Sequence, residues 1–166
     1  MRDAKKAFCW IIDILDRHSI TYRISGGLAA QVYGVDRELV DIDIEIPDSA
    51  IYKIIDDVRS YIIFGPGRYK DTYWDLELLT LTYAEQDIDI CGFEAKIYNQ
   101  NTNQWEYCSS SINKTIEQKL IFGKIVPVES IDSLIVYKKK LGREVDREDV
   151  RQLEEIVSSR DRKKVM

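Results

Sequence analysis

Two pairs of aspartates lie inside otherwise apolar stretches of the chain. One isoleucine separates Asp41 from Asp43, and another separates Asp87 from Asp89. Because side chains alternate along a β-strand, the two aspartates of each pair share one face, with their β-carbons roughly 7 Å apart. Carboxylates at this spacing can converge on one cation. If the two strands lie side by side, the sequence therefore predicts an oxygen-rich metal site.

Clustered carboxylates repel one another, and this repulsion has to be compensated. Like charges about 4 Å apart repel by about 4 kcal/mol at an effective dielectric constant of 20. A domain of this size has only ~5–15 kcal/mol of total stability. A bound cation or a raised pKa would relieve the cost. Because oxygen ligands favour hard cations, we expect Mg²⁺ or Mn²⁺ rather than zinc.

The simplest alternative is that these acids line the solvated face of an antiparallel strand. Aspartate is a poor strand former, and Val or Thr would serve such a face better. Two such pairs in one small chain weaken this alternative without removing it. The spacing also leaves open whether Asp87 or Asp89 would complete the cluster.

A glycine turn lies upstream of the first pair of acids. Ser25, Gly26 and Gly27 stand between a strand-like run and a helix-favouring run. Glycines let backbone N–H groups approach an anion closely, and a helix N-terminus adds favourable partial charge. Arg37, four residues before Asp41, could pair with a phosphate bound there. An ordinary tight turn and a solvated arginine are the alternative interpretation.

Together, these features resemble the nucleotidyltransferase superfamily. In that family a Gly-Gly or Gly-Ser turn opens a helix, an Asp-x-Asp motif lies on the next strand, and a third carboxylate lies on a later strand. The run from Arg37 to Asp43 is most similar to the branch that holds the aminoglycoside nucleotidyltransferases and small relatives. The stretch 134–146 is similar to the closing helices of that branch.

The resemblance implies a role for each matching residue. Asp41, Asp43 and Asp89 would be catalytic and would bind Mg²⁺, with Asp89 either a ligand or the base that activates an acceptor hydroxyl. Asp89 is preferred to Asp87 because strands of the family place apolar residues on either side of that acid. The nucleotide-binding residues implied are Ser25, Gly26, Gly27, Arg37 and Lys138.

The implied reaction is Mg²⁺-dependent transfer of a nucleoside monophosphate from an NTP such as ATP to an acceptor hydroxyl, with release of pyrophosphate. The acceptor could be a small molecule, a protein side chain or an RNA end. The small size of the chain raises an alternative, a non-catalytic protein of the same fold that acts as an antitoxin-like or regulatory binding partner. A second alternative is a structural domain whose acids only solubilise an open sheet face.

The elements that must position these residues follow from the spacing of apolar side chains. Helical spacing predicts helices over residues 3–18, 28–33, 50–60, 131–141 and 147–158. Alternation predicts strands over residues 22–24, 39–46, 62–64, 76–83, 86–91, 93–98, 105–107, 116–121 and 124–128. This order predicts an α+β fold. The resemblance implies a nucleotidyltransferase-like mixed β-sheet flanked by helices, with C-terminal helices.

Local signals give four further expectations. The Gly-Pro-Gly run at 65–67 should close a strand as a turn, and Asp146 should cap the last helix. Glu45 should contact solvent at the end of its strand. Residues 159–166 should form a frayed tail.

Composition places these features in a single domain spanning residues 1–166. The chain carries a net charge of −5, which argues against a protein that binds nucleic acid mainly through contacts with the phosphate backbone. Three widely spaced cysteines and one histidine make a structural zinc site unexpected. No apolar run is long enough for a bilayer, and no leader for export is recognisable. We therefore expect a cytoplasmic protein without membrane contact.

Overall fold

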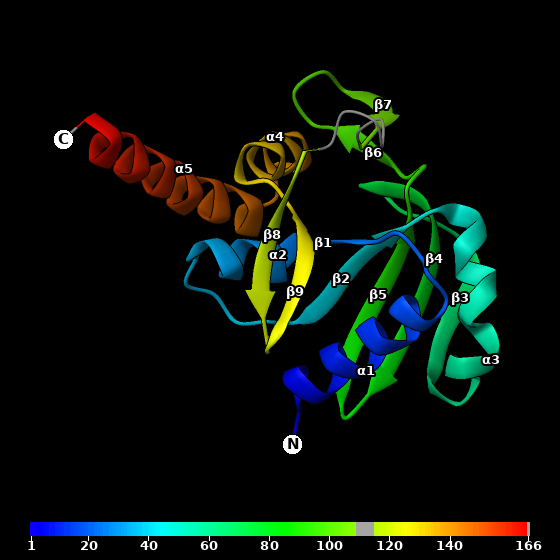
Figure 1. Ribbon diagram of the computed structural model, residues 1–166. Coiled ribbons are helices and arrows are strands. Elements are labelled where there is room, and N and C mark those ends of the chain that lie inside the picture. Colours follow the sequence, from blue (N-terminus) through cyan, green and yellow to red (C-terminus); the bar gives the residue numbers. More distant parts are fainter. Residues whose placement is uncertain (109–114, 166) are drawn as a thin grey trace.

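The computed structural model describes residues 1–108 and 115–165. Within these residues the chain has an α+β architecture built on one mixed nine-stranded sheet (Figure 1). The strand order is β7-β6-β4-β5-β2-β1-β9-β8, and β3 pairs with β4. The strands are β1 (Arg23–Ser25), β2 (Asp41–Ile46), β3 (Ile62–Lys70), β4 (Trp74–Tyr83), β5 (Gln86–Gly92), β6 (Lys96–Asn99), β7 (Gln104–Tyr107), β8 (Ile116–Ile121) and β9 (Lys124–Glu129).

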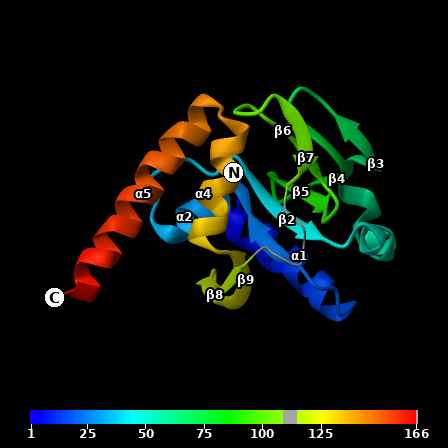
Figure 2. The ribbon, with the colours of Figure 1, turned by 90° about the horizontal axis from the view of Figure 1, so that it is seen from above.

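Helices flank the sheet and close the described chain. The α-helices are α1 (Ala4–Arg17), α2 (Gly26–Tyr33), α3 (Ile55–Val58), α4 (Ile131–Leu141) and α5 (Glu144–Val165). Two 3₁₀ segments, η1 (Asp48–Ile54) and η2 (Arg59–Tyr61), flank α3. Helices α4 and α5 pack against each other and against α2, and Figure 2 shows α4 and α5 together beside the sheet. The expected α+β fold with C-terminal helices is confirmed.

The hydrophobic core lies on one face of the central strands. Ile42 and Ile44 of β2 and Ile88 of β5 are fully buried, and they join one apolar cluster with Phe8 and Leu15 of α1. The period of two sends Asp41, Asp43 and Asp89 to the opposite face. The same strands therefore bury an apolar face and present acids on the other.

Local sequence signals account for the N-terminus of α1 and for the β8–β9 hairpin. Asp3 caps α1 by accepting a hydrogen bond from the Lys6 backbone N–H at 2.9 Å. Phe122 and Gly123 connect β8 to β9 with positive φ values of 49° and 84°, which matches a two-residue hairpin turn. Ser130 likewise caps α4, where its side chain accepts a hydrogen bond from the Ser133 backbone N–H.

Two expectations about the segment after β2 were wrong. Residues 50–60 are mainly 3₁₀ rather than α-helical, and no side chain caps them. The Asp48 carboxylate instead accepts a hydrogen bond from the Glu94 backbone N–H at 3.1 Å. The Gly-Pro-Gly run at 65–67 does not end a strand, since β3 continues to Lys70 with register shifts around this run. A proline is tolerated there because irregular edge pairing does not require its missing N–H.

Two expectations about the C-terminal region were also wrong. Helix α5 begins at Glu144, so Asp146 lies inside the helix, where it is fully buried. Residues 159–165, expected to fray, continue α5 to Val165, and residue 166 lies outside the described residues. None of the described helices has both the length and the apolar character needed to cross a bilayer.

Replacing Leu15 tests how far the sheet depends on α1. Leu15 is fully buried, whereas Ile125 on β9 is 68% exposed. We expect Leu15→Ala to lower the free energy of unfolding by ~2–5 kcal/mol, because a large side chain leaves a cavity in a packed core. Ile125→Ala should change it by less than about 0.5 kcal/mol. Urea denaturation measures both, and equal losses would contradict this account of the core.

Candidate active site

Strand pairing aligns three candidate residues and a threonine across the sheet. β1 pairs with β2 so that Ser25 lies opposite Asp43, and β2 pairs in parallel with β5 so that Asp43 lies opposite Asp89. β4 then places Thr80 opposite Asp89. Directly paired residues project from the same face of a sheet. One row therefore runs from the glycine turn, through the acids, to β4.

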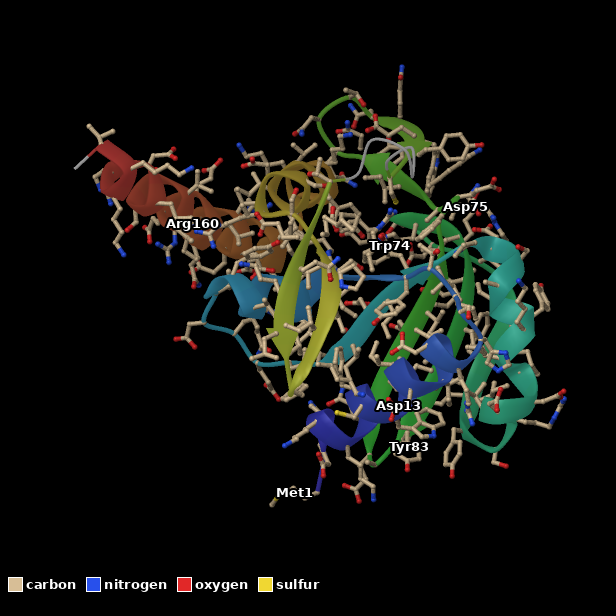
Figure 3. The ribbon with its side chains drawn as sticks, in the orientation of Figure 1. Met1, Asp13, Trp74, Asp75, Tyr83 and Arg160 are labelled. Atoms are coloured by element: carbon tan, nitrogen blue, oxygen red, sulfur yellow. The ribbon has the colours of Figure 1, made fainter. Side chains whose placement is uncertain are left out.

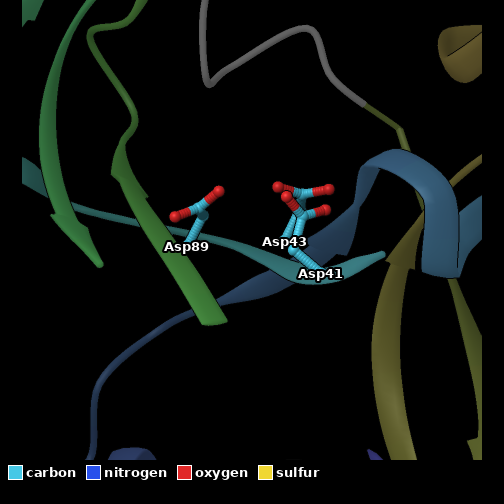
Figure 4. Close-up of side chains that lie close together, drawn as sticks. All are labelled: Asp41, Asp43 and Asp89. Carbon is cyan, nitrogen blue, oxygen red and sulfur yellow. The ribbon is translucent and has the colours of Figure 1, made fainter. Parts of the chain in front are cut away.

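Three carboxylates converge on this row. Carboxylate oxygens of Asp41, Asp43 and Asp89 all lie within 4.8 Å of one another, and Figure 4 shows Asp89 facing the other two from its own strand. Asp87 is exposed, accepts a hydrogen bond from Thr82 and lies outside this group. The predicted meeting of acids from two strands is thus present, with Asp89 as the third member.

Burial and mutual repulsion change the acidity of this cluster. Burial raises the pKa of the Asp43 carboxyl well above its ordinary value, and the Asp41 and Asp89 carboxylates raise it further, against the opposing effects of Lys138 and the Gly27 N–H. Burial also raises the pKa of Asp89 to about 6, although a hydrogen bond from the Thr80 hydroxyl opposes this shift. Without a cation, the cluster therefore favours partial protonation.

The donor set fits a hard divalent cation. All three groups offer carboxylate oxygens, which suit Mg²⁺ and Mn²⁺. The strands that carry Asp43 and Asp89 are hydrogen-bonded to each other, so the backbone cannot move one acid away from the other. A cation between them would offset both the burial of the charged groups and the repulsion that together raise their pKa values.

Glycine is required where α2 approaches the acids. Gly26 has a φ of +62°, and a β-carbon on it would lie 2.1 Å from Asp43 Oδ2. A β-carbon on Gly27 would lie 3.0 Å from Arg37 Cζ. The Gly27 N–H donates to Asp43, while Ser25 makes no side-chain cap. The N-terminus of α2 therefore lies directly against the acid cluster and Arg37.

Basic side chains from three parts of the chain meet beside this turn. Lys138 of α4 is 3% exposed, and its Nζ lies 2.8 Å from Asp149 Oδ2 and 3.7 Å from Asp146 Oδ1. Arg37 pairs with the same Asp149 oxygen. Arg143 pairs with Asp146 at 2.7 Å. Three cations share two carboxylates, so this group carries a net charge of +1, which favours binding of an anion.

The sequence analysis missed the two carboxylates of this group. Asp146 was expected only to cap the last helix and Asp149 was given no role, yet both are buried on α5 and hold the basic residues in place. Their spacing of three residues puts them on one face of a helix. Two acids at this spacing, after a helix that carries Lys138, were the sequence signal that could have indicated these ion pairs.

One cavity brings the predicted site residues together. Its volume is about 560 Å³. The acids Asp41, Asp43 and Asp89 line it. All five predicted nucleotide-binding residues also line it, namely Ser25, Gly26, Gly27, Arg37 and Lys138. The structure therefore gathers every candidate residue at one site.

Glu45, which was expected to contact solvent, is buried instead. It lines the same cavity but is only 9% exposed, and it forms an ion pair with the buried Arg23. The Arg23 guanidinium also lies over the Phe93 ring, 4.4 Å from its centroid. The antiparallel register of β1 and β2 places Arg23 directly opposite Glu45. This pairing removes Glu45 from solvent, and short-range sequence signals do not reveal it.

No protein-family model and no curated protein matches the sequence, but solved structures do. The protein TM1012 of Thermotoga maritima, provisionally described as a nucleotidyltransferase, has a TM-score of 0.67 and 21% identity over 92% of this chain and 94% of its own. The lincosamide antibiotic adenylyltransferase LnuA, solved with lincomycin bound, has a TM-score of 0.61 and 18% identity over 93% of this chain and 98% of its own. ANT(2")-Ia in complex with adenylyl-2"-tobramycin has a TM-score of 0.57 and 15% identity over 95% and 97%.

These comparisons define the class of fold. The chain has the α+β fold of nucleotidyltransferases, including antibiotic adenylyltransferases, which confirms the resemblance seen in the sequence. The identities of 15–21% establish the fold alone. The activity has to be argued from the site itself.

The raised pKa of Asp89 predicts a pH-dependent effect of removing its charge. The pKa rises from 3.8 to about 6 on folding, so the folded state binds more protons between these values and loses stability as the pH rises through them. In EDTA at pH 7, we expect Asp89→Asn to be more stable than wild type by ~1–2 kcal/mol. At pH 4 this gain should disappear. Urea unfolding at both pH values measures it, and an equal gain at both would contradict the prediction.

A pair of glycine substitutions separates local strain from damage to the site. Gly26 and Gly123 both have positive φ, but a β-carbon on Gly123 would meet nothing within 4 Å. Both alanine variants should lose about 1 kcal/mol of stability from backbone strain. If the site binds Mg²⁺ with ATP, as the resemblance implies, the two together should raise the melting temperature, and only Gly26→Ala should abolish this rise, because its β-carbon would displace Asp43. If both variants keep that rise, the proposed role of the turn is wrong.

Proposed function

We propose that this protein is a Mg²⁺-dependent nucleotidyltransferase that moves a nucleoside monophosphate from an NTP such as ATP to a hydroxyl of an acceptor. One observation carries the proposal: three carboxylates from β2 and β5 converge beside the glycine turn of α2. A structural domain would gain nothing from this arrangement, since burial and mutual repulsion raise the pKa of Asp43 and Asp89 and lower stability.

The residues of the cavity divide into two roles. Asp41, Asp43 and Asp89 would hold Mg²⁺ or Mn²⁺, which when bound neutralises charge that develops on the phosphates and aligns the acceptor oxygen. The α2 N-terminus, Arg37 and Lys138 would bind the β- and γ-phosphates, because backbone N–H groups and cations favour anions. Asp149 keeps both cations in position through shared ion pairs.

The reaction balances without a further reactant. The acceptor oxygen forms a bond to the α-phosphorus while the bond from that phosphorus to the bridging oxygen of the β-phosphate breaks. Pyrophosphate leaves with the bonding electrons towards Arg37 and Lys138. The hydroxyl proton passes to a carboxylate oxygen of Asp89 or to solvent. The protein mainly supplies positioning and preorganised charge.

The structural neighbours support a hydroxyl acceptor. LnuA is an adenylyltransferase solved with lincomycin, and ANT(2")-Ia was solved with an adenylylated tobramycin. By analogy we propose ATP as the nucleotide and an acceptor bound in the same cavity. RNA ends and partner proteins are the other acceptors that the reaction would allow. A reaction that consumes NTP also fits a cytoplasmic location.

Two aspartate substitutions with a matched control test the proposal. We expect Asp41→Asn and Asp43→Asn to weaken binding of ATP in the presence of Mg²⁺ at least tenfold, because each removes a carboxylate ligand. Asp87→Asn changes an exposed acid outside the cluster and should leave the affinity within twofold. Isothermal titration calorimetry with a non-hydrolysable ATP analogue measures all three.

The same titration distinguishes the alternatives. If the wild-type protein binds no nucleotide at millimolar concentration, the proposal is wrong and a non-catalytic role in binding a partner protein is favoured. Equal affinities of wild type and Asp43→Asn would show that the acid cluster does not act in nucleotide binding.

A further inference from the structure

We propose that the acceptor is an uncharged small molecule that carries its hydroxyl beside a flat, apolar face. It would bind along Trp74, Leu76 and Leu78 of β4, which we call the apolar wall. This inference rests on the proposed function and deepens it by naming the chemical class of the acceptor. It follows from the direction of attack, from the composition of the wall and from the placement of charge.

The direction of attack places the acceptor over β4. In-line displacement requires the attacking oxygen to enter opposite the leaving pyrophosphate. The glycine turn, Arg37 and Lys138 lie on the β1 side of the acids, so pyrophosphate leaves towards that side. The row across the sheet continues on the other side from Asp89 to Thr80 of β4. The acceptor hydroxyl must therefore approach from the β4 side.

The wall is apolar because alternate residues of β4 share one face. Trp74, Leu76 and Leu78 line the cavity on the same face as Thr80, and Tyr69 of β3 lies opposite Leu76 in the strand pairing and lines it as well. A cavity of about 560 Å³ with such a lining is typical of a small-molecule site. Apolar side chains at this position bind an apolar surface of the ligand.

Trp74 is held in a fixed orientation. Its indole Nε1 donates a hydrogen bond to the Tyr137 hydroxyl of α4 at 2.9 Å. The Arg143 guanidinium lies 4.7 Å from the centre of the Trp74 ring. Because its polar atom is satisfied and its ring is supported, Trp74 offers a rigid flat surface to a ligand. This rigidity lowers the entropic cost of binding a flat molecule.

Charge placement disfavours an amine-rich acceptor. The carboxylates of β4 lie on the face away from the cavity, where Asp75 accepts a hydrogen bond from Arg68 at 2.7 Å and Glu77 accepts one from Tyr52 at 2.8 Å. Figure 3 shows Asp75 towards the periphery and Trp74 nearer α4. Among the described residues that line the cavity, the acids are the three-carboxylate cluster and Glu45, which pairs with Arg23.

A polycation would therefore find no suitable partner on the wall. Each ammonium group that enters a cavity needs a carboxylate to offset the loss of hydration. The charged group that lies against Trp74 of the wall is instead a cation, the Arg143 guanidinium. An uncharged molecule avoids this cost and gains from contact with Trp74, Leu76 and Leu78.

The indole N–H signal of Trp74 provides a specific test in a ¹H–¹⁵N spectrum. The protein would be saturated with Mg²⁺ and a non-hydrolysable ATP analogue, and the signal would be assigned with Trp74→Phe. The probes are 2-naphthol, a flat uncharged hydroxyl compound, and tobramycin, an amine-rich one. We expect 2-naphthol to shift the Trp74 signal in a saturable manner. Trp10, stacked on Tyr83 outside the cavity lining, should not shift, and equimolar tobramycin should leave Trp74 unchanged.

A substitution in the wall adds a second measurement. Leu78→Ala keeps the Trp74 signal but removes apolar contact, and we expect at least fivefold weaker binding of 2-naphthol. Ile125→Ala removes an exposed isoleucine of β9 outside the cavity lining and should leave this affinity unchanged. Thermal melting of both variants verifies that they are folded.

The outcomes separate this inference from the proposed function. Binding of the ATP analogue without a response to 2-naphthol, or a larger shift with tobramycin, would overturn the inference alone. So would displacement of 2-naphthol by adenosine, because the wall would then be a nucleobase site. Absence of nucleotide binding would overturn the proposed function, and with it the inference.

Discussion

Mutual repulsion among Asp41, Asp43 and Asp89 is the constraint on which the site depends. Hydrogen bonding between β2 and β5 fixes Asp43 opposite Asp89, so the backbone cannot separate the charges. The buried apolar face of the same strands, with Ile42 and Ile88 at its centre, supplies the stability that offsets this repulsion. A divalent cation would relieve the repulsion among the three carboxylates, and this relief would contribute to the free energy of cation binding. The fold thus holds the acids in an arrangement that favours a ligand over the empty state.

On the cationic side of the cavity, by contrast, like charges are held together by ion pairs with carboxylates. Here three basic residues are gathered around only two carboxylates, Asp146 and Asp149, and the pairing limits both their mobility and their charge. Helix α5 supplies both carboxylates and therefore connects the end of the chain to the loop that carries Arg37. An anion bound at the N-terminus of α2 would meet groups that are already in position, and it would lose little binding energy to their ordering.

One face of the sheet therefore carries three kinds of surface in sequence. The glycine turn and cations lie at β1 and α4, the acids lie at β2 and β5, and the apolar wall lies on β4. A phosphate chain, a metal and an acceptor would need this order for in-line transfer. The proposed reaction class rests on the first two surfaces, whereas the proposed acceptor rests on the third.

Local patterns in the sequence were sufficient for most elements, for the acids and for the glycine turn, because the period of two and the glycine requirement are properties of short segments. They failed at residues 50–60, which are mainly 3₁₀ without side-chain caps, and at 65–67 and in α5, where irregular edge pairing and buried ion pairs override local preference. The resemblance already favoured Asp89 over Asp87, but the meeting of Asp89 with Asp41 and Asp43, the pairing of Glu45 and the apolar wall depended on strand register. Register brings together residues far apart in the chain, and it is set by the packing of the whole sheet.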